Sequence, residues 1–113
     1  MTKCKFFKLK DNFVGFECNG HTGYAEYGED VLCATVSGIV QSCQIGLMQV
    51  LEIEIKLFRD DDNGYIKIEL PKNLSDEKLS QSQILFKTVY HSIKDLMQGY
   101  SKYISMEVIE YDF

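Results

Sequence analysis

The stretch TKCKFFKLKDNFVGFECN, residues 2 to 19, decides the fold, because its pattern predicts a β-hairpin with one buried face. We expect strands over 2–9 and 13–19, joined by a three-residue loop over 10–12 that places Leu9 opposite Phe13. Successive side chains of a strand point to opposite faces. In this register, one face carries Cys4, Phe6, Val14, Phe16 and Cys18.

Two cross-strand pairs support the register. Phe6 lies opposite Phe16 on the apolar face, and Lys5 lies opposite Glu17 on the other face, where the opposite charges attract. A slip of one residue would place Phe6 opposite Glu17 and mix the two faces, so we expect a single register.

Beyond the hairpin, the sequence predicts a loop over 20–29 and a helix over 31–49 that Asp30 caps. Apolar residues occur almost all round this helix, which indicates that the helix is largely buried. Small residues at every fourth position indicate close packing against a sheet, a helix or another subunit. These residues are Ala34, Gly38, Ser42 and Gly46.

Alternating apolar and charged residues predict a second hairpin around the turn RDDDNG, residues 59 to 64, which does not match the calcium-binding EF-hand pattern. Pro71 ends this hairpin, Ser75 caps a second helix that ends near Gly99, and residues 103–111 form a last strand. One apolar stripe of that helix comprises Leu79, Phe86, Val89, Ile93, Leu96 and Tyr100. The order ββαββαβ predicts a single α+β domain over 1–113, with two helices packed on a mostly antiparallel sheet.

Composition excludes several classes of protein. Acidic residues outnumber basic ones by 17 to 12, and the net charge of −5 argues against a protein whose main task is to bind nucleic acid. No run approaches the roughly 20 apolar residues of a membrane span. The N-terminus lacks the apolar core of a signal peptide, so we expect a cytoplasmic protein.

The chain has four cysteines, which we expect to be reduced in the cytoplasm. The hairpin register places Cys4 opposite Cys18, and we interpret them as two small buried hydrophobes in preference to a redox pair. There is no CxxC pair, and the two histidines lie far apart in the sequence, so we do not expect a zinc site.

One cysteine and one histidine suggest chemistry. With Asp30 as the cap, Cys33 falls in the first helical turn, where the positive end of the helix dipole lowers the pKa of a thiol. The nearby acidic side chains oppose that effect. His21 lies twelve residues earlier in a glycine-flanked loop that allows it to fold over the helix start and act as a base. The same spacing also fits a surface histidine and a core cysteine, the interpretation that we give to His91 and Cys43.

The segment GHTGYAEYGEDVLCATVS, residues 20 to 37, resembles the signature of the ribosomal-processing cysteine proteases, the Prp family. The residues that match are Gly20, His21, Gly28, Asp30, Cys33 and Ser37. The length of the chain and the order of its elements also fit that family. The resemblance implies a homodimeric cysteine endopeptidase that removes a short N-terminal extension from a large-subunit ribosomal protein and needs no cofactor.

The resemblance also implies individual roles. His21 and Cys33 are the catalytic pair, Asp30 and Ser37 support the site or the substrate, and residues 20–29 hold a mobile active-site loop. From the residues themselves, Asp30 fits a helix cap better than the acid of a triad. Ser37, one turn beyond Cys33, either hydrogen-bonds near the thiol or bonds back into its own helix.

Three alternatives stay open. Tyr24 and Tyr27 either line a groove for an extended peptide or shield the site until substrate arrives. A non-catalytic ribosome-assembly or ribosomal-protein-binding factor would bind without cleavage and would be indifferent to thiol alkylation. A redox sensor would couple oxidation of Cys33 to a resolving cysteine. Cys43 is a poor candidate for that role, because ten residues of helix place it about 15 Å away from Cys33 along the axis.

Overall fold

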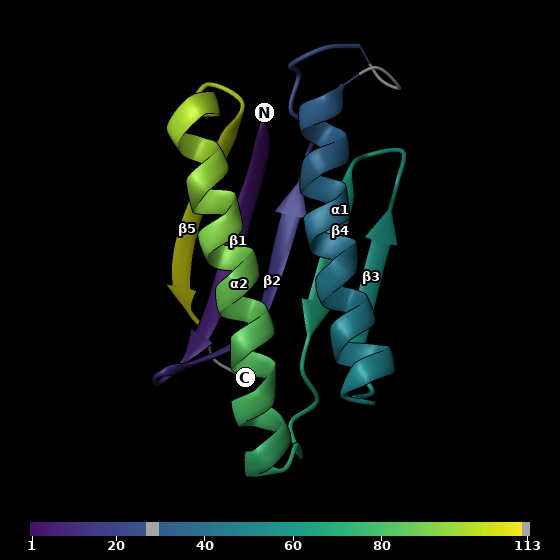
Figure 1. The fold of residues 1–113 in the computed structure, drawn as a ribbon, viewed down its shortest axis with the longest axis vertical. Coiled ribbons are helices and arrows are strands. Elements are labelled where there is room, and N and C mark those ends of the chain that lie inside the picture. Colours follow the sequence, from purple (N-terminus) through teal and green to yellow (C-terminus); the bar gives the residue numbers. More distant parts are fainter. Residues whose placement is uncertain (27–29, 112–113) are drawn as a thin grey trace.

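The computed structural model describes residues 1–26 and 30–111, and its elements follow the predicted order (Figure 1). They are β1 (Thr2–Leu9), β2 (Asn12–Asn19), α1 (Val31–Ile45), a π-helical turn η1 (Gly46–Val50), β3 (Lys56–Asp60), β4 (Tyr65–Glu69), α2 (Asp76–Tyr100) and β5 (Ile104–Glu110). The strands form one sheet in the order β3-β4-β2-β1-β5, in which only the β1–β5 pairing is parallel. Both helices cover the same face of this sheet (Figure 1), so the predicted α+β fold is confirmed.

The β1–β2 register is confirmed over most of its length and differs from the prediction at the turn. Phe6 pairs with Phe16 as predicted, but a bulge follows Phe7, and Leu9 pairs with Asn12 instead of Phe13. The prediction of a three-residue loop over 10–12 is therefore wrong. A tighter turn joins the strands, and Lys10 in this turn has a positive φ of 57°.

Because of the bulge, the side chain of Phe13 belongs to the core cluster. Val14, which the predicted register placed on that face, does not belong to it. There the ring of Phe13 packs against those of Phe6 and Tyr90, the latter from α2. The buried Gln83 of α2 pairs with the backbone of Phe13, accepting from its N–H at 2.7 Å and donating to its carbonyl at 2.8 Å. A side chain thus supplies the hydrogen bonds that a regular ladder would make, and it ties α2 to β2.

The prediction that the helix over 31–49 is largely buried is wrong, because α1 packs one face on the sheet and exposes the other face. Its buried residues are Leu32, Val36, Val40 and Cys43. Along the small-residue stripe, Gly46 contacts Leu85 of α2, whereas a Cβ at Gly38 would meet nothing within 4 Å. Among the described residues, the Gly46 end of that stripe packs against α2, whereas Gly38 faces open space.

Within the described part of the chain, one helix, Val31–Val50, is long and apolar enough to cross a membrane by length and composition alone. A helix that covers a sheet passes the same test. This one packs Leu32, Val36 and Val40 into the core.

The second hairpin is shorter at its start and extends further into the acidic turn than predicted. Residues 52–55 precede β3 without regular structure, whereas Arg59 and Asp60 belong to the strand. The Ser75 cap and the end of α2 near Gly99 are confirmed. Of the predicted α2 stripe, Phe86, Val89 and Ile93 are buried, and Tyr100 is exposed at the helix end.

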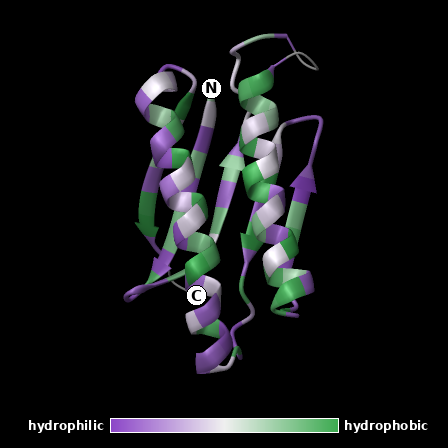
Figure 2. Cartoon of the chain, viewed as in Figure 1, coloured by the Kyte–Doolittle hydropathy of each residue, from purple (hydrophilic) through white to green (hydrophobic). Residues whose placement is uncertain are grey.

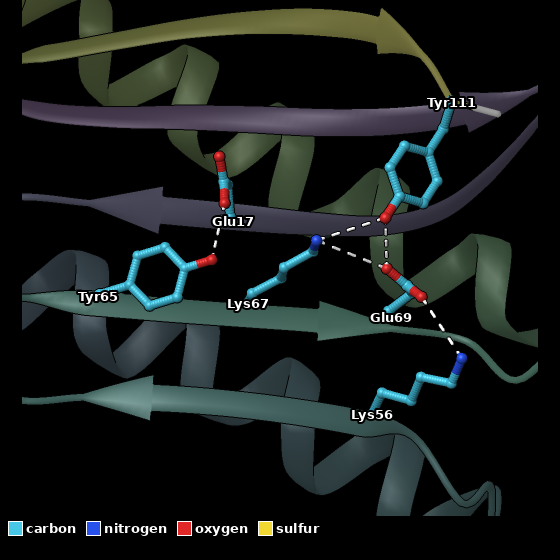
Figure 3. Close-up of polar contacts among 6 residues, drawn as sticks. All are labelled: Glu17, Lys56, Tyr65, Lys67, Glu69 and Tyr111. Carbon is cyan, nitrogen blue, oxygen red and sulfur yellow. Dashed lines mark hydrogen bonds and ion pairs between the residues drawn. The ribbon is translucent and has the colours of Figure 1, made fainter. Parts of the chain in front are cut away.

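The uncovered face of the sheet carries a polar network (Figure 3). Tyr65 donates to Glu17 at 2.9 Å, and Tyr111 donates to Glu69 at 2.6 Å. Glu69 also pairs with Lys56 and Lys67, each at 3.7 Å. Burial and the neighbouring Glu17 raise the pKa of Tyr65, which keeps its hydroxyl a donor. These contacts satisfy polar groups on the side of the sheet opposite α1 and α2.

Candidate active site

A cavity of about 520 Å³ opens between the first turns of α1, the end of β2 and the β3–β4 hairpin. His21 and Cys33 both line it, together with Ser37 and Gln41 of α1 and Arg59 of β3. The first turn of α1 is hydrophobic, whereas the first turn of α2 is hydrophilic (Figure 2). The cavity therefore combines an apolar helix start with a few polar side chains, as is typical of ligand sites.

Asp30 fixes the position of Cys33. Its backbone is extended, and its Oδ1 accepts from the Cys33 N–H at 2.9 Å, which is the geometry of a helix N-cap. The predicted cap is confirmed, and Cys33 lies in the first turn of α1. The Ala34 N–H donates to the Asp30 carbonyl, so both of these helical N–H groups have partners within the cap.

The same carboxylate anchors the loop that carries His21. Oδ2 accepts from the buried hydroxyl of Thr22 and from the N–H groups of Tyr24 and Ala25, at 3.0 and 3.2 Å. Burial of Asp30 opposes its ionisation, but the hydrogen bonds from Thr22, Cys33, Ala25 and Tyr24 outweigh burial and lower its pKa. One ionised side chain thus holds both the helix start and the loop.

The imidazole of His21 lies between the thiol and the second hairpin. Its Nδ1 is 3.7 Å from Cys33 Sγ, and its Nε2 is 3.0 Å from the carbonyl oxygen of Asp62. Cys33 is only partly buried and opens to the cavity. A thiol, an imidazole within reach of it and the positive end of a helix are the elements of thiol-based nucleophilic chemistry.

The other three cysteines are buried. Cys4 and Cys18 lie opposite each other as predicted, with their sulfur atoms 2.7 Å apart. Hydrogen bonding to Cys4 and burial raise the pKa of Cys18, and burial raises the pKa of Cys43 to about 12. The thiols of Cys18 and Cys43 therefore stay protonated at neutral pH, whereas Cys33 faces the cavity beside an imidazole.

Not all of the predicted site residues gather at the cavity. Gly20 and Ser37 line it, and the hydroxyl of Ser37 accepts from Gln41 at 2.6 Å, within its own helix. The ring of Tyr24 packs against Tyr100 and Tyr103 at the end of α2. Tyr27 and Gly28 lie outside the described residues.

Three residues near His21 and Cys33 have no counterpart in the sequence-based assignment. Thr22 is buried against Asp30, the Asp62 carbonyl contacts His21, and Gly64 lies against the imidazole. The Asn63–Gly64 pair indicated a turn, but nothing in the sequence indicated that this turn meets a loop more than forty residues away. Within residues 1–26 and 30–111, no three His, Cys, Asp or Glu side chains lie close enough to hold a metal ion.

The family model described as cysteine protease Prp matches residues 1–105 of this chain. A curated relative, the ribosomal processing cysteine protease Prp of Bacillus subtilis (strain 168), is 29% identical over 87 residues, which cover 77% of this chain and 78% of that protein.

Two crystal structures resemble the fold described above. The structure of SMU.848 from Streptococcus mutans has a TM-score of 0.84 and 26% identity, and the match covers 98% of this chain and 96% of that one. The structure of an essential ribosomal processing protease Prp from S. aureus, in complex with a covalently linked product peptide, has a TM-score of 0.84 and 19% identity. That match covers 96% of this chain and all of the other.

Proposed function

Because this chain belongs to the cysteine protease Prp family, we propose that it cleaves peptides with Cys33 as nucleophile and His21 as general base and acid. The observation that carries the proposal is the 3.7 Å contact between Cys33 Sγ and His21 Nδ1 at the start of a helix, inside a cavity. Hydrogen bonds of catalytic groups are often long before substrate binds and shorten in the complex.

In the proposed reaction, His21 Nδ1 takes the thiol proton and the sulfur attacks the scissile carbonyl carbon. The C–N bond then breaks, and the imidazolium gives its proton to the leaving amine. A water molecule then attacks the thioester carbon while His21 takes a proton from the water. The C–S bond breaks, the acid product leaves, and the imidazolium returns its proton to the sulfur, which restores the thiol and the neutral imidazole. Donors to the developing oxyanion come from groups other than the Cys33 and Ala34 N–H, because the cap already engages those two.

We propose as substrate the N-terminal extension of a large-subunit ribosomal protein. The names of the relatives from B. subtilis and S. aureus support a ribosomal processing role. The open cavity beside Cys33, with Ser37 and Gln41 along the same side of α1, supports the binding of an extended peptide.

The test is intact-mass analysis of the ribosomal protein after incubation with the enzyme. We expect the wild type to remove the extension, Cys33→Ala and His21→Ala to fail, and Cys33→Ser to bind the peptide without turnover. Cys43→Ala and His91→Ala are the matched controls, because each removes the same chemical group outside the cavity. Binding without cleavage by the wild type, unaffected by alkylation, would instead support the non-catalytic ribosomal-protein-binding factor.

We also propose that the chain forms a homodimer through the outward face of α1. Val31 and Ile45 are 68% and 49% exposed on that helix, and the space beside Gly38 admits close approach of a second helix. Sedimentation should give a dimer for the wild type and a monomer for Ile45→Glu. The matched control is Ile84→Glu on α2, where Ile84 is 70% exposed, and it should remain dimeric.

A further inference from the structure

The β3–β4 turn reaches the proposed catalytic histidine from a distant part of the chain. It lies at the same end of the molecule as the first turn of α1 (Figure 1). The Asp62 carbonyl oxygen is 3.0 Å from His21 Nε2, and the Gly20 N–H donates to the Gly64 carbonyl at 2.9 Å. The turn therefore contacts both the ring of His21 and the backbone directly before it.

The contact with Asp62 decides which ring nitrogen faces the thiol as a base. A carbonyl oxygen only accepts hydrogen bonds, so His21 Nε2 must carry the proton that joins them. Nδ1, on the thiol side, is then free of a proton in the neutral ring and protonated in the imidazolium. Both states that the proposed reaction needs keep the same contact to the turn.

Glycine at position 64 permits this approach. Gly64 has a φ of +63°, and a Cβ built there would lie 3.1 Å from both Cε1 and Nδ1 of His21. A side chain would push against the ring at the nitrogen that faces the thiol, and the left-handed backbone would be strained as well.

Side chains within the turn hold its shape. The Asp60 carboxylate accepts from the Asn63 side-chain amide at 2.6 Å and from the Asn63 N–H at 3.4 Å. These bonds to Asn63 lower the pKa of Asp60, so it is ionised at neutral pH. The Gly64 N–H donates to the Asp61 carbonyl at 3.1 Å and closes the turn.

We propose that the β3–β4 turn orients the catalytic imidazole, with the Asp62 carbonyl in the role that a carboxylate has in a catalytic triad. Gly64 and Asp60 are positioning residues: Gly64 leaves room for the ring, and Asp60 holds the turn through Asn63. The Asp30 carboxylate does not take this role, since its oxygens accept from Thr22, Tyr24, Ala25 and Cys33. This inference rests on the proposed function of His21.

The test compares Gly64→Ala, Asp60→Ala and Asp60→Asn with His21→Ala in peptide cleavage. Displacement of a catalytic group by about 1 Å can cost about 10²-fold in rate. We therefore expect kcat of Gly64→Ala to fall about 100-fold while KM changes less than about threefold. Asp60→Ala should lose about tenfold, and Asp60→Asn, which keeps one acceptor, should recover part of that loss.

A second readout is the rate at which iodoacetamide alkylates Cys33, measured against pH. It reports the coupled thiol and imidazole without substrate, and we expect its profile to shift in Gly64→Ala and Asp60→Ala. Ser75→Ala is the matched control, because it also removes a side-chain acceptor from a backbone N–H, that of Lys78 at the start of α2. It should keep the wild-type profile.

The outcomes separate the two hypotheses. If Gly64→Ala and both Asp60 variants keep the wild-type kcat and alkylation profile while His21→Ala is inactive, the orienting role is wrong and the proposed function stands. If His21→Ala cleaves normally, the proposed function itself is wrong, and the orienting role is overturned with it. Asp60 is exposed, so its variants should fold even if thermal melts show that Gly64→Ala does not.

Discussion

Replacement of Asp30 by alanine should cost far more stability than the loss of an ordinary helix cap. The carboxylate accepts one hydrogen bond from the start of α1, one from the buried Thr22 hydroxyl and two from loop N–H groups. Loss of an N-cap alone costs about 1 kcal/mol. The Thr22 side chain is buried, and a buried hydroxyl that loses a charged acceptor adds about 2 kcal/mol.

The loop N–H groups of Tyr24 and Ala25 can regain water, because both residues are exposed, so we count no further loss for them. We therefore expect Asp30→Ala to lower the free energy of unfolding by about 3 kcal/mol. For a domain of this size that corresponds to a fall in Tm of about 12 °C.

Urea and thermal unfolding followed by circular dichroism measure this loss. The control is Ser75→Ala, which removes a cap with a single side-chain hydrogen bond and should cost about 1 kcal/mol. The difference of about 2 kcal/mol between the two variants measures the anchoring of the loop. Equal losses in the two variants would refute the conclusion that Asp30 holds the loop as well as the helix.

Three further predictions concern pH, thiol reactivity and sheet packing. The pKa of Asp30 is lowered in the folded state, so its ionised carboxylate stabilises the protein at pH values above the unfolded pKa of about 4. This stabilisation is lost as the pH falls through the lower pKa of the folded state. The stability gap between wild type and Asp30→Asn should thus narrow from pH 7 to pH 3 in urea titrations, and a constant gap would contradict the assignment. Iodoacetamide at pH 8 should label Cys33 before Cys18 and Cys43, because the pKa values of those two thiols are raised. Peptide mass mapping measures the order of labelling, and equal labelling of the three cysteines would contradict this prediction. Gly15→Ala should lower stability by more than about 2 kcal/mol in urea, because its Cβ would lie 2.5 Å from the Ile68 carbonyl oxygen, whereas Gly99→Ala has open space and should not destabilise α2.

The parts of the fold that local chemistry determines could be predicted from the sequence. The pairing of Phe6 with Phe16 followed from the alternation of residues on two strands, and the caps at Asp30 and Ser75 followed from single side chains next to apolar periodicity. The juxtaposition of His21 and Cys33 was suggested by the motif, since the loop between them is short and starts at the end of β2.

Features that depend on distant residues could not be predicted. The bulge at the first turn reflects Gln83, which reaches Phe13 from seventy positions along the chain. The exposure of one face of α1 was not predicted. The composition of a helix shows how apolar the helix is, but it does not show how much of the helix the sheet covers. The contact of His21 with Asp62 exists only once the second hairpin lies beside the first.

The hydrogen bonds between the Gln83 side chain and the backbone of Phe13 make the contact between α2 and β2 measurable by amide exchange. The Phe13 amide proton is held by a side chain of α2, so its exchange with deuterium requires that side chain to withdraw. Amides within β1 and β2 are held by the strands themselves and exchange by a different opening. Exchange of the Phe13 amide therefore measures, at one position in a spectrum, how often the Gln83 side chain leaves β2 while the hairpin beneath it stays intact.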